Sequence, residues 1–182
     1  MARRTTRKPR PPLNEEQLRE LALTYVGRFA TTRAKLGAYL ARKIRERGWA
    51  AERPADIEAI VERMSELGYV DDAAYALSKS RSLTARGYGE RRVSQSLRAA
   101  GIGDEDAEPA HEHARAEAVE AALQFARRRR IGPYGDGSTD RQQLERQLAA
   151  MIRAGHSFSL AKAILSLEPG MKVSIEILEE KA

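Results

Sequence analysis

Apolar residues recur three or four positions apart along most of the chain beyond residue 13, in runs rich in Ala, Leu, Arg, Glu and Gln. This spacing puts apolar side chains on one face of an α-helix, and the alternation typical of half-buried strands is nearly missing. Asn14, followed by Gln17 three positions later, has the pattern of a capping box and predicts the start of the first helix. We therefore predict an all-α fold without a central sheet. One short exception is the alternation of Val173, Ile175 and Ile177, which is typical of a strand.

Three similar segments recur along the chain at intervals of about 50 residues, and each has a glycine as its second-last residue. The segments span residues 40–49, 93–102 and 147–156, and their glycines are Gly48, Gly101 and Gly155. Each glycine stands where an amphipathic helix would end in the left-handed conformation. A further helical segment is predicted after each of them, over residues 54–67, 104–130 and 159–167.

This repeat predicts an elongated array of three tandem three-helix modules, similar to helix-turn-helix units, each too small to bury its apolar face alone. Prolines among like charges indicate that the N-terminus stays extended and solvated, and Pro169-Gly170 stops the last helix. The predicted organisation is a disordered basic tail over residues 1–12, modules over 13–71, 72–118 and 119–168, and a C-terminal tail over 169–182.

Charge narrows the class of partner. The chain has 182 residues, 32% of them charged, and a formal net charge of +6. Five basic residues and no acidic residue lie within residues 1–12. This excess suggests a polyanionic partner. Cysteine is absent, which excludes disulfides and thiolate metal sites, and no run approaches the roughly 18 apolar residues of a membrane span. We expect a soluble, cytoplasmic monomer without a membrane partner.

Residue types used in catalysis occur without the spacing that catalysis needs. His111 and His113 are two positions apart in a predicted helix, so they lie on different faces and are poor joint metal ligands. Asp71 and Asp72 precede a predicted helix and are better explained as residues that complement its positive end. We therefore predict a binding protein, not an enzyme, with no catalytic residue, no metal site and no cofactor.

Two further features allow both a functional and a structural interpretation. Trp49, Tyr69 and Tyr75 could stack on nucleobases, but their places beside helix ends and in apolar faces favour core anchors. Gly87-Tyr88-Gly89 could let backbone amides meet a phosphate, although a Gly-x-Gly pair is weak as a phosphate motif. We interpret it as a turn with functional arginines nearby.

Cations recur at one helical phase in two of the modules. On the helix that ends at Gly48, Leu36 and Leu40 lie in the apolar stripe at 100° per residue. Three cations share the opposite face: Lys35, Arg42 and Arg45. Arg98 occupies the place of Arg45 in the second module. A single charged helix face is usually only solvated, but its recurrence favours a binding surface.

Two more basic groups are candidates for partner or DNA binding. The first group flanks the Gly87–Gly89 turn and consists of Arg81, Arg86, Arg91 and Arg92. The second group, Arg127, Arg128, Arg129 and Arg130, closes a helix, where cations also complement the negative end of the helix dipole. Four adjacent arginines point around the whole helix, so some of them must face solvent or a partner.

Five segments together resemble the RecX regulators of the bacterial recombinase RecA, over residues 20–167. The segments are 25–36, 45–49, 67–76, 86–89 and 97–102, and Leu67-Gly-Tyr-Val-Asp-Asp72 is the most specific part. The resemblance implies a curved row of three-helix units that binds RecA filaments on single-stranded DNA, contacts the DNA through phosphates without sequence specificity, and inhibits ATPase, strand-exchange and coprotease activities. Two departures from the family pattern are Phe29, where members often have a basic residue, and a longer loop over residues 132–140.

Two other functions remain open at this stage. The first is a helix-turn-helix transcriptional regulator that binds duplex operators, and the second is an RNA-associated scaffold. A helix that reads sequence would present Asn, Gln and Arg to base edges near its N-terminal half, and the predicted helices offer few such residues.

Overall fold

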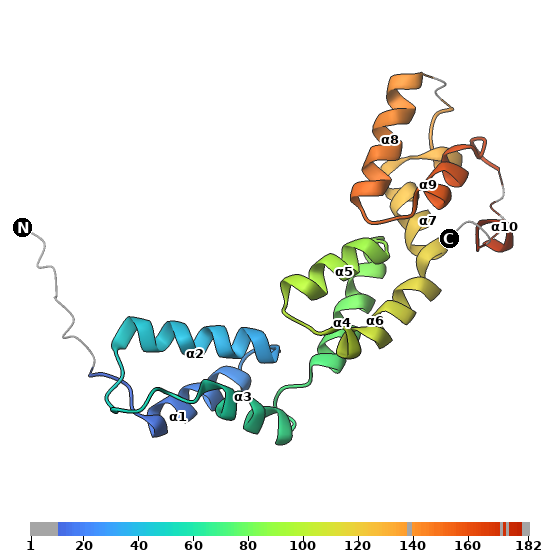
Figure 1. The fold of residues 1–182 in the computed structure, drawn as a ribbon. Coiled ribbons are helices and arrows are strands. Elements are labelled where there is room, and N and C mark those ends of the chain that lie inside the picture. Colours follow the sequence, from blue (N-terminus) through green and yellow to red (C-terminus); the bar gives the residue numbers. More distant parts are fainter. Residues whose placement is uncertain (1–10, 138–139, 172, 174, 180–182) are drawn as a thin grey trace, which may run out of the picture. The chain divides into compact units, whose positions relative to one another are not determined.

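The computed structural model of the protein describes residues 11–137, 140–171, 173 and 175–179, and these are almost entirely helical (Figure 1). The predicted all-α fold is confirmed: within these ranges there is no strand, only an isolated bridge between Leu13 and Trp49. Backbone contacts divide the chain into two compact units, Met1–Asp71 and Asp72–Ala182.

The first unit consists of α1 (Glu15–Val26), α2 (Arg33–Arg47) and α3 (Ile57–Glu66). The predicted capping box is present, because Asn14 Oδ1 accepts from the Gln17 amide at 2.9 Å and Gln17 Oε1 accepts from the Asn14 amide at 3.4 Å. The three helices bury one apolar core, whose members include Leu18, Leu36, Leu40, Ile60 and Met64.

The N-terminal edge of this unit is anchored by main-chain contacts. The Leu13 amide donates to the Gly48 carbonyl and the Ala50 amide donates to the Leu13 carbonyl, both at 2.9 Å, while the Leu13 side chain is fully buried. Arg47 donates to the Pro11 carbonyl from Nε at 3.3 Å and from Nη2 at 3.0 Å. The five cations predicted for the basic tail lie within residues 1–10, outside the described residues.

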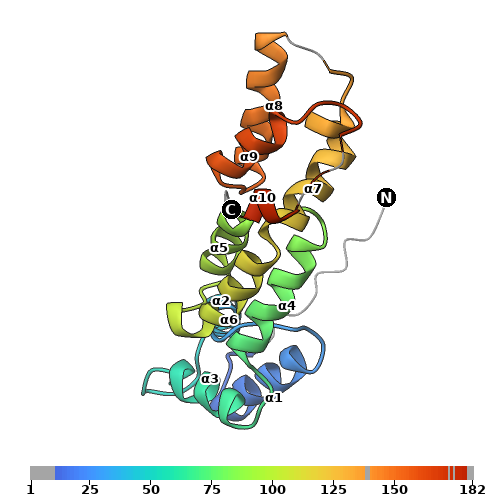
Figure 2. The same cartoon turned by 90° about the vertical axis from the view of Figure 1, so that its right-hand side faces the viewer.

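The second unit begins with α4 (Asp72–Thr84), α5 (Glu90–Ala99) and α6 (Asp104–Ala116). Helices α4 and α6 lie side by side, as both Figure 1 and Figure 2 show. Their shared core contains small alanines from α4 and α6 beside larger residues such as Leu83, Val93 and Leu97. Alanines allow two helix backbones to approach closely, which explains the extensive contact between α4 and α6.

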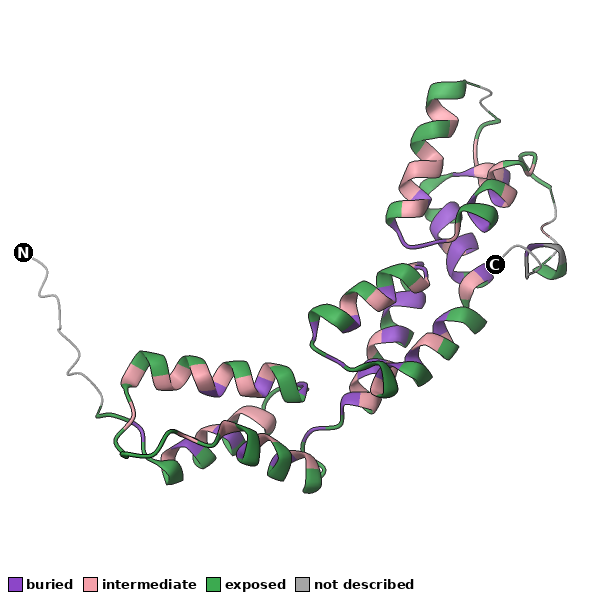
Figure 3. Ribbon diagram, in the orientation of Figure 1, coloured by how far each residue is buried: buried purple, intermediate pink, exposed green. Residues whose placement is uncertain are grey.

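The rest of the second unit has its own core, visible as the buried stretch of α7 in Figure 3. Around this core lie α7 (Ala118–Arg129), the short 3₁₀ helix η1 (Gly132–Tyr134), α8 (Arg141–Arg153), α9 (Phe158–Leu165) and α10 (Ile175–Glu179). The single helix predicted over 104–130 is interrupted at Glu117. This segment therefore forms two helices: α6 packs in the core shared with α4 and α5, and α7 packs in the last core.

Two predictions about local structure need correction. The alternation at 173–177 does not form a strand, because α10 forms instead and buries Leu178 against the core. Tyr69 is not a core anchor: its side chain is 55% exposed, and the neighbouring Val70 fills the core. Tyr75 and Trp49 do pack against cores as half-buried residues, and Trp49 Nε1 donates to the Arg53 carbonyl at 2.7 Å.

The three repeat glycines adopt the positive φ that was predicted, 84° at Gly48, 73° at Gly101 and 99° at Gly155. Gly48 nevertheless differs from a left-handed helical cap, because its ψ is 170°. The chain extends at once into the bridge between Leu13 and Trp49, and the Gly48 carbonyl accepts the Leu13 amide there. The three repeat glycines therefore share a positive φ, but the chain after Gly48 does not continue as it would after a left-handed helical cap.

Candidate functional site

Two glycines in the second unit bring the α4–α5 turn against the α8–α9 turn. The Gly89 amide donates to the Ala154 carbonyl at 3.0 Å, and the Arg91 amide donates to the Gly155 carbonyl at 3.2 Å. A Cβ on Gly89 would collide with the carbonyl oxygen of Gly155. The glycines therefore permit a close approach of two backbones. The amides of residues 87–89 all donate within the fold, which agrees with the interpretation of this segment as a turn and not as a phosphate loop.

His156 lies at this junction and is not among the site residues that the sequence predicts. Its side chain is 2% exposed, and Nε2 lies 3.2 Å from the Gly87 carbonyl oxygen, so the neutral ring donates from Nε2. The Phe125 ring packs at 5.6 Å between centroids. Burial lowers the pKa of His156 to about 4, and the hydrogen bond to Gly87 opposes this shift only in part. His156 is therefore a neutral packing residue near pH 7.

A cluster of arginines around Tyr88 lies on the surface beside this junction. The guanidinium carbon of Arg86 is 5.4 Å from the centre of the Tyr88 ring, and that of Arg92 is 6.0 Å from it. Arg128, at the end of α7, donates from Nη1 to the Arg86 carbonyl at 2.8 Å. We call these four residues the Tyr88 cluster. It unites arginines from both groups that the sequence analysis treated separately.

The Tyr88 cluster borders a hollow of about 400 Å³ between α4 and α5. Lys79 and Gln95 line the same hollow, and Arg92 Nη1 donates to Gln95 Oε1 at 2.7 Å. The nearest acidic residue in sequence, Glu90, is engaged by Arg115 at 3.5 Å. A guanidinium held over an aromatic ring is oriented by a cation–π contact and keeps N–H groups for a ligand. The arrangement suits a phosphate or carboxylate, which guanidinium groups can bind in bidentate fashion.

The run of four arginines at the end of α7 does not act as one group. All four side chains are exposed, but Arg127 donates to the Tyr134 hydroxyl at 3.4 Å and lies over that ring at 5.1 Å. Arg129 lies 5.8 Å from the centre of the Phe125 ring, and Arg130 adopts a positive φ of 55° at the helix end. Only Arg128 of the run joins the Tyr88 cluster.

The basic face predicted for α2 is weaker than its sequence suggests. Arg42 and Arg45 are exposed and Lys35 is half-buried, but Glu46 pairs with Arg42 at 3.7 Å and with Lys43 at 2.8 Å. These contacts, the hydrogen bond from Lys43 first, hold the pKa of Glu46 below its usual value. Glu46 therefore neutralises part of the face.

Four predicted arginines remain available to a partner. Within the described ranges no ion pair involves any of the exposed side chains of Arg45, Arg81, Arg91 and Arg98. Arg91 and Arg98 lie on nearly the same side of α5, away from the buried Val93 and Leu97. Arg45 belongs to the first unit and Arg98 to the second.

The other two histidines have packing roles. Nδ1 of His111 lies 3.3 Å from Ser94 Oγ on α5, and Nδ1 of His113 lies 3.3 Å from Ser80 Oγ on α4. They contact different helices, as expected for residues two positions apart. Among the residues that the structure describes, no group of three or more His, Asp or Glu side chains could hold a metal ion. No helix of that part of the chain is both long and apolar enough to span a bilayer.

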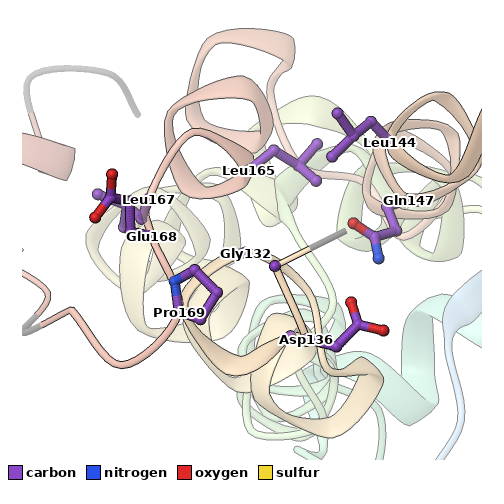
Figure 4. A pocket seen from close by; sticks show the side chains of 10 residues that line it. Gly132, Asp136, Leu144, Gln147, Leu165, Leu167, Glu168 and Pro169 are labelled. Carbon is purple, nitrogen blue, oxygen red and sulfur yellow. The ribbon is translucent and has the colours of Figure 1, made fainter. Parts of the chain in front are cut away.

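A hollow of about 210 Å³ in the C-terminal part lies beside η1 and residues 135–137 (Figure 4). Leucines and glycines form much of its wall, and the polar side chains are those of Asp136, Gln147 and Glu168. Figure 4 shows the two carboxylates on opposite sides, with Glu168 directed away from Asp136. They do not form the facing pair of carboxyl groups that general acid–base chemistry uses, so this hollow gives no support to catalysis.

Comparisons with known proteins agree with this helical architecture. The family model described as RecX, second three-helix domain, matches residues 71–110, which contain α4, α5 and the Tyr88 turn. Two solved RecX structures share the fold. One, from Lactobacillus salivarius, has a TM-score of 0.61 at 20% identity and covers 82% of this chain and 93% of that one. The other has a TM-score of 0.59 at 23% identity and covers 82% of this chain and 70% of that one.

Sequence comparison extends over nearly the whole chain. The regulatory protein RecX of Myxococcus xanthus is 34% identical over 163 residues, with 84% of this chain and 86% of that protein covered. The regulatory protein RecX of Mycobacterium sp. (strain KMS) is 32% identical over 162 residues and covers 86% of each. The family resemblance noted in the sequence is thereby confirmed, and the chain belongs to the RecX family of regulatory proteins.

Proposed function

We propose that this chain binds filaments of the RecA recombinase on single-stranded DNA and inhibits their ATPase, strand-exchange and coprotease activities. Membership of the RecX family supports a regulatory role, and the Tyr88 cluster is the observation that carries the contact. Two guanidinium groups lie over the Tyr88 ring beside an open hollow, and a third, that of Arg128, binds the Arg86 carbonyl. The chain would act by binding and not by catalysing a reaction of its own.

The cluster fits phosphates or clustered carboxylates of a filament better than the base edges of a duplex. Its Arg86 and Arg128 are fixed through a ring contact and a main-chain hydrogen bond, which orients them as a rigid basic surface. Gln95 could read a base edge, but its Oε1 already accepts from Arg92. Contacts of this kind position a partner without selecting a sequence.

The proposal is tested with a RecA ATPase assay on single-stranded DNA in which the protein is titrated. Wild type should lower the rate, whereas Arg86→Glu combined with Arg92→Glu should raise the half-inhibitory concentration at least tenfold, because two attractive contacts become repulsive. The matched control is Arg141→Glu, an exposed charge of the same unit that pairs with Glu145 on its own helix.

An unchanged ATPase rate with wild-type protein would overturn the proposal. Tight, sequence-specific duplex binding in the same preparation would then favour the transcriptional regulator. The proposed partner also carries two expectations: the chain acts in the bacterial cytoplasm, where recombinase filaments form on DNA, and it is a monomer. Light scattering during size-exclusion chromatography tests the second.

A further inference from the structure

We propose that the first unit carries a stacking site for an unpaired nucleobase, formed by the exposed ring of Phe29 at the end of a column of aromatic rings. The inference deepens the proposed function, since it assigns the bases of a single strand to a surface outside the Tyr88 cluster. Single-stranded nucleic acid is bound in many proteins by aromatic rings beside cations.

The column joins two helices and the loop between them. The Tyr25 ring of α1 stacks on the Tyr39 ring of α2, with centroids 4.2 Å apart and planes inclined by 18°. The Phe29 ring packs against the same Tyr25 ring, with the two centroids 5.3 Å apart and the planes inclined by 48°. Tyr25 and Tyr39 are half-buried against the core, so they hold the column in place.

Phe29 itself is not needed by the core. Its side chain is 57% exposed and lies in the loop after α1, where the Phe29 amide donates to the Tyr25 carbonyl at 3.0 Å. The Arg28 amide donates to the same carbonyl at 3.1 Å. These main-chain bonds fix the loop, so the ring is presented in a defined position at little further cost in conformational entropy on binding.

Cations accompany the column. Arg42 and Lys43 lie over the Tyr39 ring, with the guanidinium carbon at 5.6 Å and Nζ at 5.7 Å from its centre. Arg28 is exposed directly before Phe29. Glu46 balances part of this charge through its contacts with Arg42 and Lys43. The cations at Tyr39 could contact phosphates of the same strand while a base covers the Phe29 ring at the other end of the column.

This chemistry favours a single strand over a duplex or a protein surface. In a duplex both faces of each base are already stacked, so an exposed aromatic ring finds no free base face except at ends or distortions. A protein hot spot would typically sit in a larger apolar patch. The exposed Phe29 ring instead directly follows the exposed Arg28 in the chain, and the two rings behind it are half-buried.

The test measures binding of the full chain to two fluorescein-labelled probes of equal length, an oligothymidylate and an abasic oligomer with the same phosphates. No recombinase is present, so the result is independent of filament regulation. Phe29→Ala should weaken binding to the oligothymidylate roughly 5- to 150-fold, the range expected for loss of one stacked base, and leave the abasic probe unaffected. Phe29→Trp should retain the affinity. The new tryptophan should add fluorescence to that of the native Trp49, and oligothymidylate should quench this added fluorescence.

Tyr69→Ala is the matched control, because Tyr69 is an equally exposed aromatic residue of the same unit, at 55%. It should bind both probes as the wild type does. Circular dichroism checks that each variant is folded. Equal loss by Phe29→Ala on both probes, or no binding of either probe by the wild type at low salt, would overturn the stacking site. Unchanged oligothymidylate binding combined with weakened inhibition of the recombinase would assign Phe29 to a protein contact, which also overturns it.

Discussion

Nε2 of His156 lies 3.2 Å from the carbonyl oxygen of Gly87, and this hydrogen bond joins the α8–α9 turn to the α4–α5 turn. The same α4–α5 turn carries the Tyr88 cluster. His156, from the α8–α9 turn, thereby supports the backbone of the α4–α5 turn directly beside the Tyr88 cluster.

The burial of His156 predicts a loss of stability in mild acid. The folded-state pKa is about 4, below the ordinary value of 6.5, so the unfolded chain binds the proton more readily. Stability should therefore be full above about pH 6.5, fall as the pH decreases towards about 4, and lose up to about 3 kcal/mol from this group. Urea unfolding of wild type and His156→Gln across this window measures it. The variant should have the shallower pH dependence, and parallel curves would contradict the assignment.

The positive φ of Gly101 predicts a conformational cost for any side chain there. Gly101→Val should destabilise the second unit by about 1 kcal/mol or more, because β-branched residues tolerate φ near 73° poorly. Gly103→Val is a control at a glycine with φ of −72° and nothing within 4 Å of a built Cβ. Thermal unfolding of both variants should show the larger decrease for Gly101→Val. Equal decreases would show that the loss of stability does not come from the positive φ of Gly101.

Arg45 and Arg98 test whether the recurrent cation is functional. Arg45→Glu combined with Arg98→Glu should abolish inhibition of single-stranded-DNA-dependent ATPase while circular dichroism shows normal helicity. Both side chains are exposed, so the cores should tolerate the reversal, and each single reversal should weaken inhibition less than the pair if the two contacts act together. Arg63→Glu, at an exposed arginine paired with Glu66, is the control. Wild-type inhibition by the folded double variant would show that Arg45 and Arg98 are only solvated side chains.

We expect the N-terminal cations to contribute to DNA binding in a salt-dependent manner. Removing residues 1–10 eliminates five cations and keeps Pro11, whose carbonyl accepts from Arg47. The slope of log K against log salt on single strands should decrease by up to about 0.7 for each lost phosphate contact. Fluorescence titrations of the full and shortened chains at several salt concentrations measure it, and identical slopes would exclude these cations from binding.

Local signals in the sequence predict the helical fold well. Apolar periodicity, the Asn14 cap and the glycines at 48, 101 and 155 all act over a few residues, so they can be recognised without knowledge of tertiary contacts. The failures arise where distant segments decide the structure. Segment 173–177 alternates like a strand, but burial of Leu178 against the last core favours a helix.

The candidate sites show the same division. Sequence patterning found Arg86, Arg92 and Arg128 as candidate contact residues, but only the fold unites them, because Arg128 reaches the Arg86 carbonyl across a long sequence separation. The Phe29 column was missed because its stacking depends on how α1 packs against α2. Close approach of Gly89 to Gly155 involves backbone alone and leaves no pattern of side chains to recognise.

The paired backbones at Gly89 and Gly155 provide intrinsic reporters of motion. The amide protons of Gly89 and Arg91 are held only by carbonyls of the opposite hairpin, so they can exchange with solvent deuterium when the hairpins separate. Neighbouring amides bonded within their own helix or turn, such as those of Tyr88 and Val93, need not open in that event. The exchange rates of these two protons, compared with those neighbours, therefore distinguish a junction that opens as a hinge from one that stays closed until the whole second unit unfolds.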